Sequence, residues 1–118
     1  MKTLQLYLSD LQELLESKDF VSTRTCLREV SPIDLADGWE LFSPEQRLVI
    51  FRLLTRPRAY QLFEELEPHH QKELLESLGR EHLTDLLQGL DPSAIGRVAR
   101  DLPQGMVRHL LSVMKRAR

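Results

Sequence analysis

Apolar residues recur every 12 positions between residues 31 and 114 of the chain. Cutting the chain at this period gives seven segments, which begin at Ser31, Ser43, Thr55, Glu67, Gly79, Asp91 and Pro103. Twenty of the 21 residues at the eighth, ninth and twelfth positions of these segments are apolar, and Gly38 is the exception. Because a fixed internal period indicates repeated structural units that stack on one another, this register is the starting point for predicting the fold.

Each 12-residue segment is predicted to form one short amphipathic helix. Positions 5, 8, 9 and 12 have the i, i+3, i+4, i+7 spacing that places side chains on one face of an α-helix. Four segments begin with Ser, Thr or Asp, and four have proline at the second position. Both features favour a helix start, and the residue before a proline disfavours continuation of the preceding helix. Ser43 and Gln46 are predicted to form a capping box.

The first 30 residues are predicted to form an opening helical hairpin. Its first helix, over residues 4–17, has Leu4, Leu8, Leu11 and Leu15 on one face, and its second spans residues 19–29. Three turns of helix do not persist alone in water, so stability is expected to come from stacking. The predicted fold is therefore all-α, a right-handed superhelix of short helical hairpins. Residues 1–30 open this single domain, and residues 31–118 supply its seven short helices.

Two features of the repeat concern its core. Trp39, Phe51 and Phe63 share the ninth position in three successive segments, and we expect them to form the spine of the core. Gly38 is expected inside the first of these helices, where glycine costs about 1 kcal/mol relative to alanine. We predict that it admits a neighbouring helix or accommodates the indole of Trp39.

Composition favours a globular cytosolic protein. The 118 residues are 42% hydrophobic and 29% charged, which excludes a disordered tail. The longest apolar run, Leu48 to Phe51, is far shorter than a membrane-spanning helix, so no direct membrane insertion is expected. The first residues lack the apolar core of a secretory signal, and the single cysteine agrees with a reducing compartment.

Charge is unevenly distributed although the net charge is only −2. Residues 1–60 carry 8 basic and 9 acidic side chains, residues 61–96 carry 2 and 8, and residues 97–118 carry 6 and 1. Such opposite patches commonly neutralise each other or face another domain, so nucleic acid is not expected as a partner. The basic end is expected to complement the dipole of the last helix. It consists of Arg97, Arg100, Arg108, Lys115, Arg116 and Arg118.

Residues with metal or catalytic chemistry form no convincing constellation. The acidic cluster of the middle region is expected to be a solvated face; it comprises Glu64, Glu65, Glu67, Glu73 and Glu76. His70 and His82 occupy the same repeat position and His69 is adjacent, but a transition-metal site needs three or four converging ligands. We therefore predict surface histidines. Cys26 is expected to be a half-buried structural thiol, with a nucleophilic role left open. An enzyme is not predicted.

Four motifs resemble one known family over nearly the whole chain. They are LQELLE at residues 11–16, PIDLAD at 32–37, LEPHHQKELL at 66–75 and LDP at 90–92. Together with the 12-residue rhythm, they resemble the N-terminal cytosolic domain of MgtE-type magnesium transporters. A related superhelix occurs in the flagellar motor switch protein, which leaves open a second interpretation, a helical-repeat scaffold that binds a protein partner and has no metal role.

The resemblance implies a regulatory domain at the cytosolic face of the inner membrane. In that family the domain precedes a pair of CBS domains and a transmembrane channel, and Mg²⁺ held by acidic side chains between the cytosolic domains stabilises the closed pore. An ion shared by two surfaces shifts the population toward docking through its differential affinity for the docked state. The resemblance thus implies Mg²⁺, a CBS pair and a channel as partners. It leaves open whether the chain is a fragment, whether it forms a homodimer and which face docks.

This chain departs from the family pattern at two places. Relatives are often acidic in the sixth segment, where this chain has Ser93, Gly96 and Arg97, and Gln61 stands in the third segment where an acidic residue can occur. Magnesium ligands are therefore not transferred to these positions, and the metal-binding residues remain unassigned.

Overall fold

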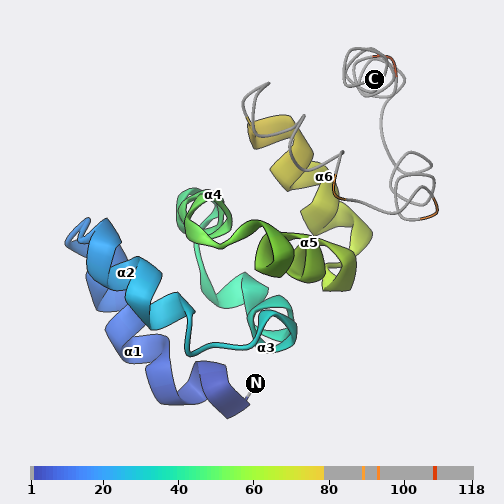
Figure 1. The fold of residues 1–118 in the computed structure, drawn as a ribbon. Helices are drawn as coiled ribbons and strands as arrows, with labels where there is room; N and C mark the ends of the chain where they lie inside the picture. Colours follow the sequence, from blue (N-terminus) through green and yellow to red (C-terminus); the bar gives the residue numbers. More distant parts are fainter. Residues whose placement is uncertain (1, 79–88, 90–92, 94–107, 109–118) are drawn as a thin grey trace. The chain divides into compact units, whose positions relative to one another are not determined.

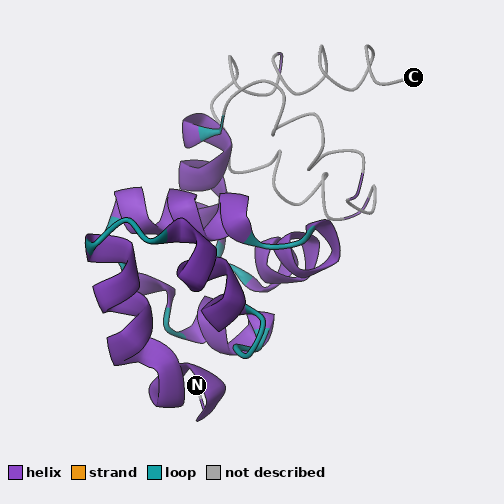
Figure 2. Cartoon of the chain, turned by 60° about the vertical axis from the view of Figure 1, so that its left-hand side comes forward, coloured by secondary structure: helices purple, strands orange, loops and turns teal. Residues whose placement is uncertain are grey.

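The described part of the chain is helical, as the 12-residue pattern predicts. In the computed structural model the described residues are 2–78, 89, 93 and 108. They form six α-helices and one 3₁₀ helix, and no strand occurs among them (Figure 2). This confirms the all-α class, whereas the right-handed superhelix and the single-domain organisation of residues 1–30 and 31–118 remain predictions. No helix in residues 2–78 combines the length and the apolar character needed to cross a bilayer.

The chain divides into two compact units, Met1–Leu66 and Glu67–Arg118, which are described separately. The first unit opens with the predicted hairpin, formed by α1 (Lys2–Glu16) and α2 (Phe20–Leu27) (Figure 1). Between the two helices Lys18 adopts a φ of 59°, in the left-handed region that reverses the chain. The side chain of Asp19 then accepts a hydrogen bond from the backbone N–H of Ser22 and caps α2.

The first repeat forms two helical pieces where one helix was predicted. Helix α3 spans Pro32–Asp37 and is followed by the 3₁₀ helix η1, Trp39–Leu41. Gly38 therefore ends α3, which corrects the expectation that it lies inside a helix. Its φ of −100° is open to any residue, so its backbone conformation does not require glycine. The residue is buried, and its proposed role, to admit a neighbouring helix or to accommodate the indole of Trp39, remains a prediction.

The next two repeats form helices with the predicted boundaries. Helix α4 spans Pro44–Leu53 and α5 spans Arg56–Glu65. The predicted capping box is confirmed, because the hydroxyl of Ser43 accepts from the N–H of Gln46 at 3.2 Å. The side-chain oxygen of Gln46 in turn accepts from the N–H of Ser43 at 3.0 Å. Thr55 precedes α5, but its side chain makes no capping hydrogen bond within the described residues.

The aromatic spine is confirmed as part of the core of the first unit. Trp39, Phe51 and Phe63 are all buried, and the rings of Phe51 and Phe63 meet edge to face with centroids 6.5 Å apart. Around this spine α1 packs on α2 and α3, α2 packs on α4, and α3 packs on α5 (Figure 1). The leucine stripe of α1 also enters the core, with Leu4 and Leu11 fully buried.

Arg58 in α5 joins two segments that are distant in sequence. Its guanidinium donates hydrogen bonds to the backbone carbonyl oxygens of Arg28 at 2.9 Å and Val30 at 3.2 Å, with a longer contact of 3.5 Å to that of Leu27. Helix α2 ends at Leu27, so these carbonyls belong to the helix end and the connection that follows it. The carbonyls of Arg28 and Val30 lie past the helix end and accept no bond within it, so Arg58 supplies their partner, whereas that of Leu27 also accepts from the N–H of Val30 at 3.2 Å.

In the second unit, α6 spans Pro68–Ser77 and corresponds to the fourth predicted repeat helix. Leu74, Leu75 and Leu78 are buried on its apolar face. The predicted helices of the repeats that begin at Gly79, Asp91 and Pro103 lie outside the described residues.

Candidate functional site

The acidic cluster of the middle region is mostly solvated, as predicted. Glu64 and Glu65 are exposed at the end of α5 in the first unit. In the second unit Glu67 and Glu76 are exposed and Glu73 is half-buried. Because these carboxylates belong to two separately described units, the acidic run of the sequence does not by itself define one site.

Glu64 and Glu65 place two carboxylates at the C-terminal end of α5, where the helix dipole is already negative. The carbonyl end of an α-helix carries a partial negative charge, and basic residues are favoured there. The last turn of α5 has no basic residue. Neither Glu64 nor Glu65 is paired with a basic side chain of the described residues. The end of α5 is therefore an exposed position at which a cation is electrostatically favoured.

The carboxylates of α6 have local partners. Glu76 lies 3.9 Å from the ammonium of Lys72, and Glu67 lies 3.5 Å from Nδ1 of His69. Both pairs are solvent-exposed, so each contributes at most about 1 kcal/mol to stability. Because Glu67 and Glu76 already lie beside hydrogen-bond donors, their carboxylates are less available to a cation than those of Glu64 and Glu65 at the end of α5.

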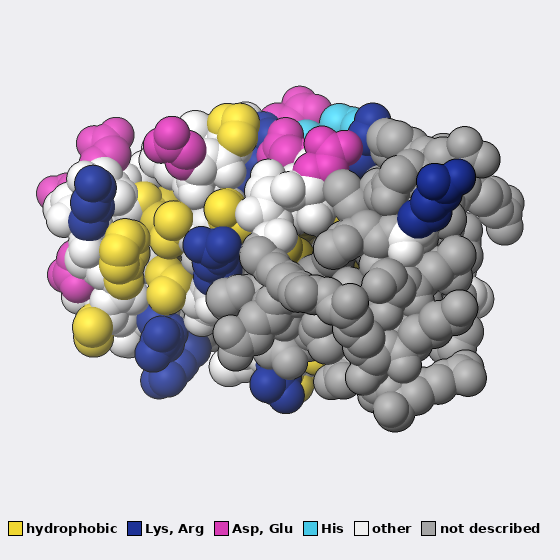
Figure 3. All heavy atoms as spheres, turned by 90° about the horizontal axis from the view of Figure 1, so that it is seen from above, with side chains coloured by type: hydrophobic (Ala, Val, Ile, Leu, Met, Phe, Trp, Pro, Cys, Tyr) yellow, Lys and Arg dark blue, Asp and Glu magenta, His cyan; other side chains and the backbone are white. Residues whose placement is uncertain are grey.

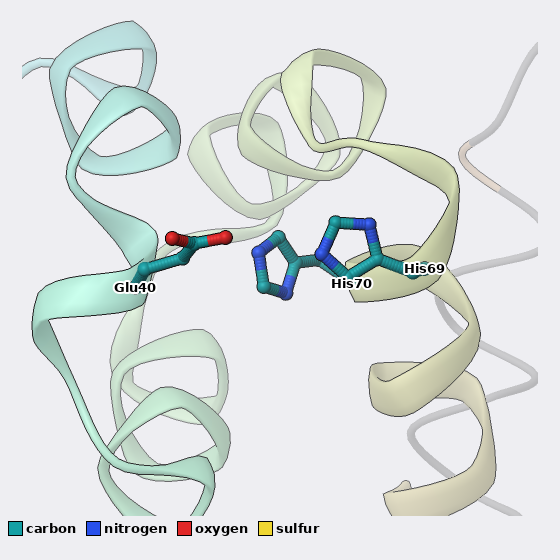
Figure 4. Close-up of side chains that lie close together, drawn as sticks. All are labelled: Glu40, His69 and His70. Atoms are coloured by element: carbon teal, nitrogen blue, oxygen red, sulfur yellow. The ribbon is translucent and has the colours of Figure 1, made fainter.

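The two adjacent histidines of α6 differ in burial. His69 is exposed, as predicted, but His70 is only 7% exposed, so its prediction as a surface residue is wrong. The reason is helix geometry, because His70 lies four residues before the buried Leu74 and so shares its face. The imidazole rings of His69 and His70 lie 3.9 Å apart at an angle of 40° (Figure 4). His82 lies outside the described residues.

The cysteine of α2 has the environment of a structural thiol. Cys26 is half-buried, which confirms the sequence prediction. Burial raises the pKa of its thiol above the ordinary value, and the negative charges of Asp10 and Glu29 raise it further. Since the thiolate is the reactive form, these surroundings oppose nucleophilic chemistry at Cys26.

The most strongly shifted carboxyl group in the first unit joins the starts of two helices. Asp34 in α3 accepts hydrogen bonds from the backbone N–H of Thr3, at 2.8 Å, and from its hydroxyl. The Thr3 oxygen in turn accepts from the N–H of Ser31 at 3.0 Å. The side-chain hydrogen bond from Thr3, followed by the backbone one, lowers the pKa of Asp34 to about 2. Asp34 thus has a structural role, which its place in the PIDLAD motif did not reveal.

Neither unit, taken by itself, places three metal-ligating side chains of its described residues around one point. A complete protein cage is not what Mg²⁺ requires, because this ion retains several waters and takes one or two carboxylates. The exposed oxygens of Glu64 and Glu65 have the donor chemistry that Mg²⁺ prefers. They therefore fit an ion that a second surface would share.

Comparison with known proteins identifies what the chain is similar to. The family described as the MgtE intracellular N domain matches residues 30–118. The magnesium transporter MgtE of Thermus thermophilus is 35% identical over 63 residues, a match that covers 53% of this chain and 14% of the transporter. The chain therefore corresponds to a small part of the length of this relative. The opening hairpin α1–α2 lies ahead of the residues that match the family.

Proposed function

Because the chain belongs to the family of MgtE intracellular N domains, we propose that it is the regulatory domain of a magnesium transporter and acts on the cytosolic side of the membrane. The family match over residues 30–118 is the observation that carries this proposal. The similarity to the Thermus thermophilus transporter supports magnesium as the ion concerned. The family is one of transporter domains, and the proposed role is regulatory, not catalytic.

The proposed mechanism is linkage between Mg²⁺ binding and domain docking. An ion held between carboxylates of this domain and those of a neighbouring cytosolic domain binds the docked arrangement more tightly than the separated one. A rise in Mg²⁺ concentration then increases the docked population by no more than that difference in affinity. In a transporter of this family, docking of the N domain against a CBS pair would favour the closed channel.

The end of α5 supports the electrostatic part of this mechanism. Glu64 and Glu65 are exposed, have no basic partner among the described residues and stand at the negative end of a helix. Each of these properties makes a bridging cation more favourable. Two carboxylates with water completing the shell form half of a shared Mg²⁺ site, so tight binding is expected only when the second surface is present.

The experiment measures thermal unfolding of the chain across a Mg²⁺ titration, alone and with a CBS-domain pair from an MgtE transporter. NaCl matched in ionic strength controls for screening, and Ca²⁺ controls for ion specificity. Because a ligand that binds only the folded state stabilises by RT ln(1 + [L]/Kd), we expect a small response alone and a saturable, Mg²⁺-specific one with the CBS pair. Equal responses to Mg²⁺ and matched NaCl in both samples would refute the Mg²⁺-dependent role.

A matched pair of variants tests the position of the ion. Glu65 and Glu16 are both exposed glutamates at the last residue of a helix, α5 and α1 respectively. We expect Glu65→Gln to weaken Mg²⁺-dependent association with the CBS pair and Glu16→Gln to leave it unchanged. Association that persists without Mg²⁺ and is indifferent to Glu65→Gln would instead support the helical-repeat scaffold with no metal role.

A further inference from the structure

The α1–α2 hairpin carries an open groove. The groove has a volume of about 630 Å³ and is formed entirely by residues between Tyr7 and Glu29. Its apolar lining comes from Tyr7 and Leu14 on α1 and from Val21 and Cys26 on α2. This lining differs from the buried stripe of α1 that faces the core, so the hairpin has a second surface, on which apolar side chains lie among polar ones such as Ser17, Ser22 and Thr25.

Part of this second surface is fully available to a partner. The side chain of Val21 is 79% exposed, the highest value among the large hydrophobic residues of the described chain. Figure 3 shows exposed hydrophobic side chains interspersed with acidic and basic ones on the left, where Figure 1 places α1 and α2. A groove with exposed apolar side chains in its wall offers a partner apolar surface to bury.

The charge around the groove indicates what kind of partner fits. Asp10, Glu13 and Glu29 line it, and no lysine or arginine does. None of these three carboxylates pairs with a basic side chain or accepts a hydrogen bond within the described part of the chain. A second copy docked face to face on the same groove would bring like charges together, which opposes self-association. A partner with positive charge around an apolar stripe would be complementary to the groove.

We propose that this groove binds a basic amphipathic helix of a partner protein. An apolar channel between two helices with charged margins is the surface that a helix-in-groove interaction uses, and Val21 and Leu14 would contact the apolar face of the bound helix. Asp10, Glu13 and Glu29 would lie opposite its lysine or arginine side chains. The groove is formed by residues ahead of the family match, and the proposal does not depend on Mg²⁺ or on transporter regulation.

The test uses synthetic helical peptides of about 18 residues, which is five turns of helix. The probe has leucine on one face and lysine on the other. One control replaces lysine with glutamate, and a second keeps the composition of the probe but scrambles the helical spacing. Titration calorimetry gives each affinity. We expect the probe to bind at least about tenfold more tightly than either control, a difference of about 1.4 kcal/mol. Equal binding of the scrambled peptide, or of the glutamate peptide, would overturn the proposal.

Matched variants then locate the binding surface. Val21→Ser removes an exposed side chain of the groove, and Ile33→Ser removes an exposed apolar side chain of α3 that does not line it. Glu13→Gln and Glu45→Gln form the corresponding acidic pair. We expect the two groove variants to weaken probe binding about fivefold or more and the two controls to change it less than twofold. Because all four side chains are exposed, folding is expected to persist, and circular dichroism checks it.

Two further outcomes would also overturn the proposal. Probe binding that falls equally for the groove variants and their controls would show non-specific attraction to an acidic protein. Sedimentation that reveals a dimer of this chain, lost in Val21→Ser, would assign the groove to a second copy. Chemical-shift changes on addition of the probe supply an independent criterion. They are expected at Tyr7, Leu14 and Cys26, and a map centred on other residues would refute the assignment.

Discussion

Arg58 provides the sharpest test of how the first unit is held together. Its guanidinium makes hydrogen bonds of 2.9 and 3.2 Å to the carbonyl oxygens of Arg28 and Val30. Each well-formed hydrogen bond contributes about 1 kcal/mol net, and the 3.5 Å contact to Leu27 is too long to add a comparable amount. Replacing Arg58 with methionine keeps much of the aliphatic volume and removes both bonds. We therefore expect Arg58→Met to lower the free energy of unfolding by about 2 kcal/mol.

Urea unfolding followed by tryptophan fluorescence measures this loss. Trp39 is the only tryptophan, is 1% exposed and lies in the same unit as Arg58, so its emission reports on the relevant structure. With an m-value of about 2 kcal/mol/M, the midpoint should fall by about 1 M urea. Arg58→Lys should give an intermediate loss, because one ammonium group keeps the charge but cannot reproduce the geometry of the guanidinium fork.

The control is Arg52→Met. Arg52 is an exposed arginine in the last turn of α4. Its replacement is expected to shift the midpoint by about 0.25 M or less, since exposed substitutions usually change stability by less than about 0.5 kcal/mol. If Arg58→Met and Arg52→Met give the same midpoint, the guanidinium does not hold the end of α2, and the argument from the hydrogen bonds is wrong.

Three other predictions concern the first unit. Because its pKa is lowered in the folded state, Asp34 contributes to folding stability fully above its ordinary pKa of 3.8, and this contribution is lost as the pH falls toward about 2. The urea midpoint should therefore decline over this pH range, and it should decline less in Asp34→Asn. Ser43→Ala should cost about 1 kcal/mol because it breaks the capping box, whereas Thr55→Ala, at an N-cap without a side-chain bond, should cost less in the same assay; equal losses would refute the capping argument. Gly38→Leu should lower the melting temperature through overpacking, and Gly38→Ala should lower it less; an unchanged melting temperature for the leucine variant would show that the buried site has room.

The sequence predicted the described helices well because their ends are determined locally. Proline at the start of α4 and α6 and the capping pair of Ser43 and Gln46 act over three or four residues, which a single sequence displays directly. The same period identified Trp39, Phe51 and Phe63 as core residues, because side chains at the same position of each repeat lie on the same face of their helices. Patterns that extend over a few residues can be recognised without knowledge of the tertiary structure.

The features that the sequence did not predict depend on partners far away along the chain. Arg58 and the carbonyl of Arg28 are 30 residues apart, and Thr3 and Asp34 are 31 apart. Nothing in the neighbourhood of an arginine or an aspartate indicates which distant group it meets, so both were indistinguishable from surface residues. The break after α3 was missed because the apolar pattern resumes at Trp39 and Phe42 after the exception at Gly38, although the α-helix ends at Asp37.

The groove and the exposed end of α5 were missed for a different reason. Leu14 and Val21 read as ordinary helix residues, and only the packing of α1 against α2 brings them to one surface. The charge of Glu64 and Glu65 was visible in the sequence, but their position at a helix end without a basic partner became clear only in the structure. Sites of this kind result from how elements are placed, which a 12-residue period does not specify.

The pairing of the helices has a consequence for how fast the first unit folds. Inside each described α-helix the backbone hydrogen bonds join residues four apart, and the contacts between helices join α1 with α2 and α3, α2 with α4, and α3 with α5. Helical proteins are rich in local contacts, so they have low relative contact order and fold in microseconds to milliseconds, because little loop entropy is lost before local contacts form. We therefore expect rapid refolding with the kinetics of a helical bundle.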